Sequence, residues 1–152
     1  MRVFVTGAAG FIGTETTKEL IANGHEVLGL ARSDANAAAL EKLGAKVHRG
    51  SLEDLESLRV GARTTDGTIH LAFIHDFAKF AENGQIDKRA ITAMGDVLEG
   101  TNKPFIVTSG TLLSGICVSC GMGEFLLYPW ESLRSSQGLG ESTEQELNRI
   151  GR

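Results

Sequence analysis

Short apolar runs alternate with stretches of helical periodicity from Met1 to about Ser114, and this alternation constrains the fold more than any other feature of the sequence. Runs rich in β-branched and aromatic residues are typical of strands, and apolar residues spaced three and four apart are typical of helices. Alternating strands and helices form a parallel sheet that helices cover on both faces. The sequence therefore predicts an α/β protein in which five parallel strands form one sheet covered by helices on both faces. The expected strands are residues 2–6, 26–31, 46–48, 68–73 and 105–108.

Four helices are expected between these strands. The first covers residues 11–23, with Ile12, Thr16 and Leu20 on one face, and Gly24 ends it.

The second helix begins at a capping residue, either Ser33 or Asp34, and runs to Leu43. Residues 51–54 resemble a capping box that opens the third helix. The fourth helix ends at Gly100. Its apolar stripe consists of Ile86, Ala90, Ile91, Met94, Val97 and Leu98.

Charge and composition exclude several classes of protein. The 152-residue chain has a net charge of −4 and no basic block, which argues against nucleic-acid binding. It has no apolar run of about 18 residues, so no transmembrane helix is expected. A cleavable signal is not expected either, because the first residues already form a strand. Two cysteines do not make a disulfide scaffold, so a cytoplasmic location is predicted.

The composition changes after residue 114. Lys103 is the last lysine of the chain. The sequence after residue 114 does not predict a sixth strand with its preceding helix. The expected organisation is therefore a domain of residues 1–114 and an irregular tail of residues 115–152, with a short terminal helix capped by Thr143 and ending at Ile150. Cys117 and Cys120 lack the further ligands that a zinc site needs, and the four histidines show no metal-binding spacing.

Three glycines follow the first expected strand in the pattern Gly-x-x-Gly-x-x-Gly. Gly7 permits a tight turn from strand to helix, Gly10 lets the backbone approach a pyrophosphate, and Gly13 lets the helix pack closely on the sheet. The free amides at the start of the helix favour a phosphate. This pattern, in its strand–turn–helix context, predicts a dinucleotide-binding site.

The segment Val-Thr-Gly-Ala-Ala-Gly-Phe-Ile-Gly resembles the short-chain dehydrogenase/reductase superfamily, in particular its extended or atypical branch of epimerases and 3β-hydroxysteroid dehydrogenases. The resemblance covers residues 1 to about 114. It implies a three-layer α/β Rossmann fold with the strand order 3-2-1-4-5, in which the carboxyl ends of the strands bind NAD or NADP. The cofactor-binding residues that it implies are Gly7, Ala9, Gly10, Phe11, Ile12, Gly13, Arg32, Ser51, Leu52, Leu71, Ala72, Phe73, Thr108 and Ser109.

Arg32 follows the second strand, where an acidic residue would hold the adenosine ribose. An arginine at that place can pair with a 2′-phosphate, so NADP is the expected cofactor. NAD remains the alternative, because Asp34 is an acidic residue only two positions further on. Ser51 stands where the family has an aspartate beside the adenine. Ser109 or Thr111 matches the family's catalytic hydroxyl, and the sequence does not choose between them.

The family's catalytic Tyr-x-x-x-Lys pair has no match, since Ser132 follows Tyr128 by four residues. No catalytic residue is therefore assigned. The chain is interpreted as the NAD(P)-binding domain of an oxidoreductase-like protein that is truncated or altered after residue 114, and we leave open whether it is an enzyme. The alternatives are a non-enzymatic NADP(H) sensor, an enzyme that uses Ser109 and His75, a methyltransferase-like domain, and a poorly folding fragment. The exposed sheet edge would favour a homo-oligomer.

Overall fold

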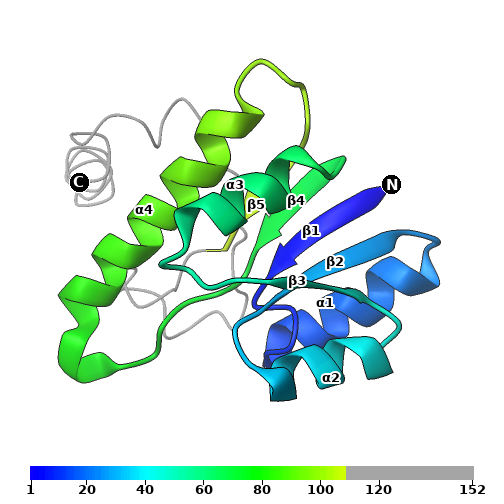
Figure 1. Ribbon diagram of the computed structural model, residues 1–152, viewed down its shortest axis with the longest axis horizontal. Coiled ribbons are helices and arrows are strands. Elements are labelled where there is room, and N and C mark those ends of the chain that lie inside the picture. Colours follow the sequence, from blue (N-terminus) through cyan, green and yellow to red (C-terminus); the bar gives the residue numbers. More distant parts are fainter. Residues whose placement is uncertain (109–152) are drawn as a thin grey trace, which may run out of the picture. The chain divides into compact units, whose positions relative to one another are not determined.

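The computed structural model describes residues 1–108, in which five parallel strands form one sheet with the order β3-β2-β1-β4-β5 (Figure 1). This is the α/β Rossmann-like fold, and the strand order, that the sequence predicts. The strands are β1 (Arg2–Thr6), β2 (Glu26–Ala31), β3 (Lys46–Arg49), β4 (Gly67–His70) and β5 (Phe105–Val107). The domain boundary expected at residue 114, and the expected tail with its two cysteines and Tyr128, lie outside the described residues.

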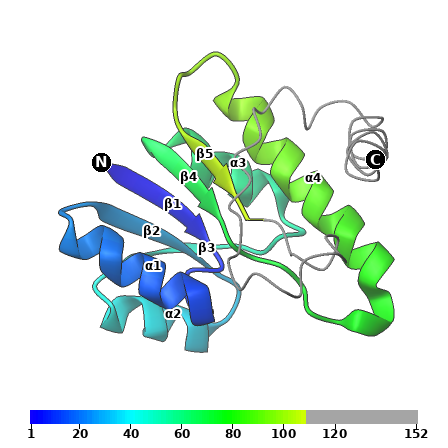
Figure 2. The ribbon, with the colours of Figure 1, turned by 180° about the vertical axis from the view of Figure 1, so that it is seen from behind.

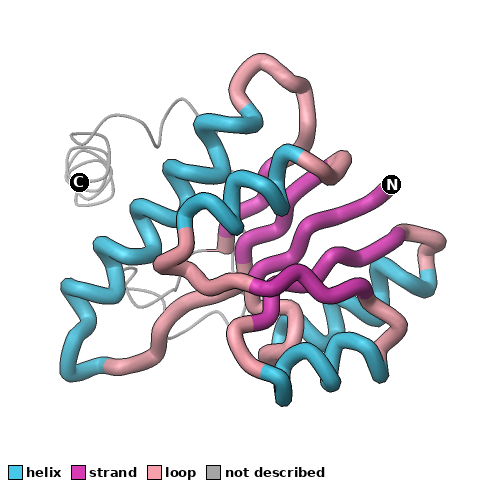
Figure 3. Tube along the Cα trace, in the orientation of Figure 1, coloured by secondary structure: helices cyan, strands magenta, loops and turns pink. Residues whose placement is uncertain are grey.

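Helices cover both faces of the sheet (Figures 1 and 2). On one face lie α1 (Phe11–Ala22) and α2 (Asp34–Lys42), and on the other lie α3 (Leu55–Arg63) and α4 (Phe80–Leu98). A short 3₁₀ helix, η1 (Phe77–Lys79), leads into α4. Figure 3 shows how each helix joins two parallel strands through short loops. Within residues 1–108, no helix is long and apolar enough to cross a membrane.

The alternating side chains of β1 divide the core into two layers. Val3 and Val5 belong to the cluster under α1 and α2, which also contains the fully buried Leu40. Phe4 points to the other face and packs with Leu58 of α3 in a second cluster. Because side chains alternate along a strand, one strand of five residues supplies both layers.

The ends of the first two helices follow the expected local rules. Gly24 and Gly44 have φ values of +78° and +84°, the left-handed conformation that ends a helix at low cost. Ser33 is the N-cap of α2, since its hydroxyl accepts a hydrogen bond from the amide of Asn36 at 3.2 Å. The structure thereby decides between the two capping residues that the sequence left open.

Two local predictions were wrong, and one helix face is only partly buried. Strand β4 ends at His70 and not at Phe73, because its neighbour β1 already leaves the sheet at Thr6 and the ladder has no further partner. Helix α3 is capped by Asp54, whose carboxylate accepts from the amide of Ser57 at 3.1 Å, and not by Ser51. Ile12 is 62% exposed, because α1 approaches the sheet with its smaller residues.

Candidate functional site

The turn between β1 and α1 is compact, and two of its glycines are required by sterics. Gly7 has φ +69°, and a Cβ added there would lie 2.8 Å from the backbone nitrogen of Ala72. A Cβ on Gly13 would overlap the carbonyl oxygen of Gly7 and lie 2.7 Å from its carbonyl carbon. Both glycines therefore bring backbone into close contact, one with the chain leaving β4 and the other within the turn itself.

Gly10 differs from both neighbours in the pattern. Its backbone is extended, with φ −79° and ψ 178°, a conformation open to any residue. Apart from the adjacent residues, the described part of the chain brings one heavy atom within 4 Å of an added Cβ, the Gly7 oxygen at 3.1 Å. A methyl group there requires that backbone oxygen to shift by a few tenths of an ångström, a smaller displacement than the overlaps at Gly7 and Gly13 require.

The start of α1 faces solvent. The first amides of a helix lack acceptors within the helix, and Gly10, as N-cap, offers no side chain to them. The first turn of α1 carries no acidic residue. Phe11 is 95% exposed beside these amides. An anion at this position would therefore meet free N–H groups and the positive end of the helix dipole.

The segments leaving β4 and β5 border the same edge of the sheet. Leu71 and Ala72 contact the glycine turn, and the Leu71 amide donates to the Thr6 carbonyl at 3.2 Å. Figure 2 shows the chain leaving β4 beside the turn between β1 and α1. Phe73 is partly buried, and its ring lies 6.0 Å from that of Phe80. Thr108, which directly follows β5, donates from its hydroxyl to the His70 carbonyl at 3.0 Å.

The segments that follow β2 and β3 lie side by side, because Ala31 pairs with Arg49 in the β2–β3 register. Arg32 follows directly and is exposed. Arg49 forms an ion pair with Asp34, with 2.7 Å between Nη2 and Oδ1. The sequence analysis missed Arg49 because it ended the third strand at residue 48; an arginine directly before Gly50 was the available signal.

Ser51 and Leu52 lie in the loop before α3. The Ser51 hydroxyl accepts from the amides of Glu53 and Asp54, at 3.3 Å each, so it stabilises a local turn. Leu52 is partly buried and packs on the cluster under α3 and α4. Ala9 lies partly buried within the glycine turn, and Ser109 and Thr111 lie outside the described residues.

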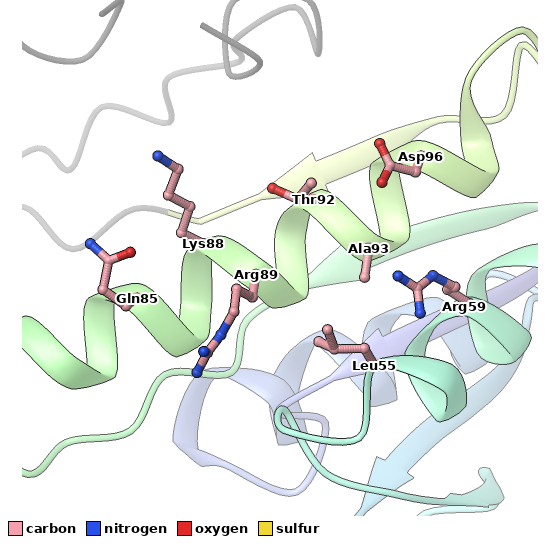
Figure 4. A pocket seen from close by; sticks show the side chains of 8 residues that line it. All are labelled: Leu55, Arg59, Gln85, Lys88, Arg89, Thr92, Ala93 and Asp96. Carbon is pink, nitrogen blue, oxygen red and sulfur yellow. The ribbon is translucent and has the colours of Figure 1, made fainter. Parts of the chain in front are cut away.

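A separate surface hollow lies between α3 and α4 (Figure 4). Its lining includes none of the residues that the sequence analysis assigned to a cofactor. Arg59, on its α3 side, is already engaged by Glu56 at 3.6 Å. The lining residues are Leu55, Arg59, Gln85, Lys88, Arg89, Thr92, Ala93 and Asp96. Among residues 1–108, no group of three or more His, Cys, Asp or Glu side chains is placed to hold a metal ion.

The fold and the glycine turn define the class of protein. A parallel sheet of order 3-2-1-4-5, with a Gly-x-x-Gly-x-x-Gly turn between β1 and α1, is a Rossmann domain of the short-chain dehydrogenase/reductase type. The sequence profile of the NAD dependent epimerase/dehydratase family matches residues 3–104. The chain belongs to this family.

Two relatives show how far the similarity extends. An uncharacterized protein of Saccharomyces cerevisiae is 54% identical over 114 residues, which cover 74% of this chain and 38% of that protein. The sterol-4-alpha-carboxylate 3-dehydrogenase (decarboxylating) of Dictyostelium discoideum is 30% identical over 118 residues, covering 78% of this chain and 34% of the enzyme. The chain thus spans little more than a third of the length of these relatives.

Among solved structures, the fold is similar to that of UDP-glucose 4-epimerase from Bifidobacterium longum in complex with NAD⁺ and UDP. The TM-score is 0.61 at 27% identity, and the match covers 76% of this chain and 38% of the epimerase. The resemblance recognised in the sequence is thereby confirmed at the level of the family and the fold.

Proposed function

We propose that residues 1–108 bind a nicotinamide dinucleotide at the carboxyl edge of the sheet, with NADP(H) preferred over NAD(H). The observation that carries this proposal is Gly10. Its backbone conformation is open to any residue, it directly precedes the first amides of α1, and it offers them no side chain. A pyrophosphate seated there needs both the space and the amides.

The remaining residues are assigned along the length of the ligand. Gly7 and Gly13 shape the turn, while Ala9, Phe11 and Ile12 flank the pyrophosphate. At one end of the ligand, Leu71, Ala72, Phe73 and Thr108 line the nicotinamide side, and Ser109 is assigned to it from the family resemblance alone. At the other end, Ser51 and Leu52 border the adenine. Parallel strands place their carboxyl ends along one edge, which supports this order.

The preference for NADP(H) rests on two arginines at the ends of adjacent strands. Arg32 is exposed, and Arg49 pairs with Ala31, the residue before Arg32, in the β2–β3 register. The carboxylate of Asp34, which would repel a 2′-phosphate, is paired with the Arg49 guanidinium. Guanidinium groups bind phosphate through paired hydrogen bonds, so this end of the sheet suits a 2′-phosphate better than a bare ribose hydroxyl.

The reaction class follows from the family and is part of the same proposal. The Dictyostelium relative is named as a dehydrogenase and the Bifidobacterium structure as an epimerase. A bound nicotinamide supplies or accepts a hydride at a carbonyl or alcohol carbon. The contribution of residues 1–108 to such a reaction is to bind and orient the cofactor.

Calorimetric titration of the 152-residue chain with NADPH and NADH tests the proposal. Gly10→Ala is compared with Gly84→Ala, the same chemical change in α4, where an added Cβ meets no atom of residues 1–108 within 4 Å apart from its own helix backbone and chain neighbours. We expect Gly10→Ala to weaken NADPH binding at least about tenfold, because its methyl group occupies the pyrophosphate position. We expect Gly84→Ala to bind as the parent chain does.

Arg32→Ala tests the choice of cofactor. We expect it to weaken NADPH binding at least about tenfold and NADH binding by less than about threefold, because one ligand alone carries the 2′-phosphate. A folded chain that binds neither nucleotide would refute the proposal. If Arg32→Ala weakened the binding of NADPH and NADH equally, the preference for NADP(H) would be refuted, while the proposal of dinucleotide binding would stand.

A further inference from the structure

His70 connects β1, β4 and α4, and both of its ring nitrogens have hydrogen-bond partners. It is the last residue of β4, pairs with Thr6 in the β1–β4 register and is 1% exposed. Its Nδ1 lies 2.7 Å from the Thr6 hydroxyl, and its Nε2 lies 3.0 Å from Oδ1 of Asp87 in α4. The register directs Thr6 and His70 to the same face of the sheet, the face that α4 covers.

The partners of the ring determine where its proton lies. An ionised carboxylate only accepts hydrogen bonds, so Nε2 carries the proton and donates to Asp87. In the neutral imidazole Nδ1 is then the acceptor, and the Thr6 hydroxyl donates to it. The Thr6 oxygen in turn accepts from the Ala72 amide at 3.3 Å. A single chain of donors therefore runs from Ala72 through Thr6 and His70 to Asp87.

Hydroxyl, imidazole and carboxylate in series also occur in nucleophilic enzymes, but here burial excludes that role. Thr6 is 0% exposed and His70 is 1% exposed, so neither side chain can reach a bound molecule. The end of the chain that meets the candidate site is the Ala72 amide, which lies against Gly7. The network thus acts on the backbone around the site and not on a reacting group.

The carbonyl group of His70 extends the junction to a third strand. It accepts from the Thr108 amide at 3.1 Å and from the Thr108 hydroxyl at 3.0 Å. One residue therefore ties together the ends of β1, β4 and β5 and anchors them to α4. Buried hydrogen-bond networks with every member satisfied are rigid and define a single arrangement.

We propose that His70 is a positioning residue of the dinucleotide site. Its hydrogen bonds to Thr6 and Asp87 fix the distance between Gly7, in the glycine turn, and Ala72, in the segment that follows β4. The inference rests on the proposed function, since it assigns to this spacing the binding of the cofactor. Ala72 and Gly7 already touch, so a small displacement of either would change the shape of the turn that receives the pyrophosphate.

Paired variants at the two ends of the network test the proposal. Thr6→Val keeps the shape of the side chain and removes the hydroxyl, whereas Thr6→Ser keeps the hydroxyl. Asp87→Ala removes the acceptor, whereas Asp87→Asn keeps one; the Asp87 side chain is 21% exposed, so these two variants should fold even if Thr6→Val does not. NADPH affinity is measured by calorimetry on the 152-residue chain. We expect Thr6→Val and Asp87→Ala to weaken it about tenfold, and Thr6→Ser and Asp87→Asn to stay within about threefold of the parent.

Leu98→Ala separates positioning from general loss of stability. Leu98 is buried at the last residue of α4, at the opposite end of that helix from η1. Its truncation destabilises the fold without touching the network, so we expect unchanged NADPH affinity. If the two Thr6 variants bind equally well, or if Leu98→Ala weakens binding as much as Thr6→Val, the positioning role is overturned while the proposed function stands.

Amide hydrogen exchange provides a readout that does not depend on the cofactor. If the parent chain binds no nucleotide, the proposed function fails, and the spacing is then judged from the amides of Ala72 and Gly10. Thr6→Val and Leu98→Ala are compared under conditions in which their global stability is equal. We expect these amides to exchange at least about tenfold faster in Thr6→Val than in Leu98→Ala. Equal exchange in the two variants would overturn the inference.

Discussion

Replacing Gly13 with alanine adds one methyl group at the closest approach between α1 and the end of β1. The new Cβ would overlap the Gly7 carbonyl oxygen and lie 2.7 Å from the Gly7 carbonyl carbon and 2.8 Å from the Ala8 Cα. All three atoms belong to the backbone, so no side chain can rotate away. The helix must move off the sheet, or the turn must change its conformation.

The expected cost follows from two opposing effects. Overpacking a well-packed site costs about 1–3 kcal/mol, and the backbone contacts here place Gly13→Ala at about 3 kcal/mol. Alanine is a better helix former than glycine by about 1 kcal/mol, which offsets part of that cost. The net loss is about 2 kcal/mol, a large fraction of the roughly 5–15 kcal/mol that stabilises a typical domain. In thermal unfolding this lowers Tm by on the order of 10 °C.

Urea unfolding followed by circular dichroism measures this loss, with Gly84→Ala as the matched control. Gly84 lies within α4, where an added Cβ meets no other described part of the chain within 4 Å, so the same substitution should stabilise the fold by about 0.5–1 kcal/mol. The two variants should therefore shift the urea midpoint in opposite directions. A Gly13→Ala chain as stable as its parent would refute the steric argument for this glycine.

Three further results are expected. Leu58 is fully buried beside Phe4, so Leu58→Ala should lower the free energy of unfolding by about 2–5 kcal/mol in urea titrations, and a loss below 1 kcal/mol would contradict the packing described. The hydrogen bond from the Lys46 ammonium holds the pKa of Glu26 below its usual 4.5, so the associated stability is present above that pH and is lost as the pH falls through the lowered value. Lys46→Met should raise the Glu26 pKa in an NMR titration, and an unchanged midpoint would dismiss the contact. Asp34→Asn should strengthen NADPH binding about threefold or more by freeing the Arg49 guanidinium, and weaker binding would argue against Arg49 as a phosphate ligand.

Local patterns in the sequence predicted most of the fold. β1 and β2 begin and end at the predicted residues, and Gly24 and Gly44 end helices in the left-handed conformation. These features depend on residues close together in the chain, where burial repeats with the period of the element. The predictions failed where residues distant in the sequence determine the end of an element. The end of β4, for example, depends on where β1 leaves the sheet.

The sequence by itself determined the alternation of strands and helices and the glycine turn, since each follows from periodicity or from spacing within a few residues, whereas the expected strand order came from the resemblance to the family. Only the tertiary structure distinguished Gly10 from Gly13, because the difference depends on which backbone atoms approach each Cα. Likewise, His70 met Thr6 and Asp87, and Arg49 met Asp34, only through strand register and helix packing. A polar side chain finds a distant partner when the fold brings both to one face, and that geometry is absent from the local order of residues.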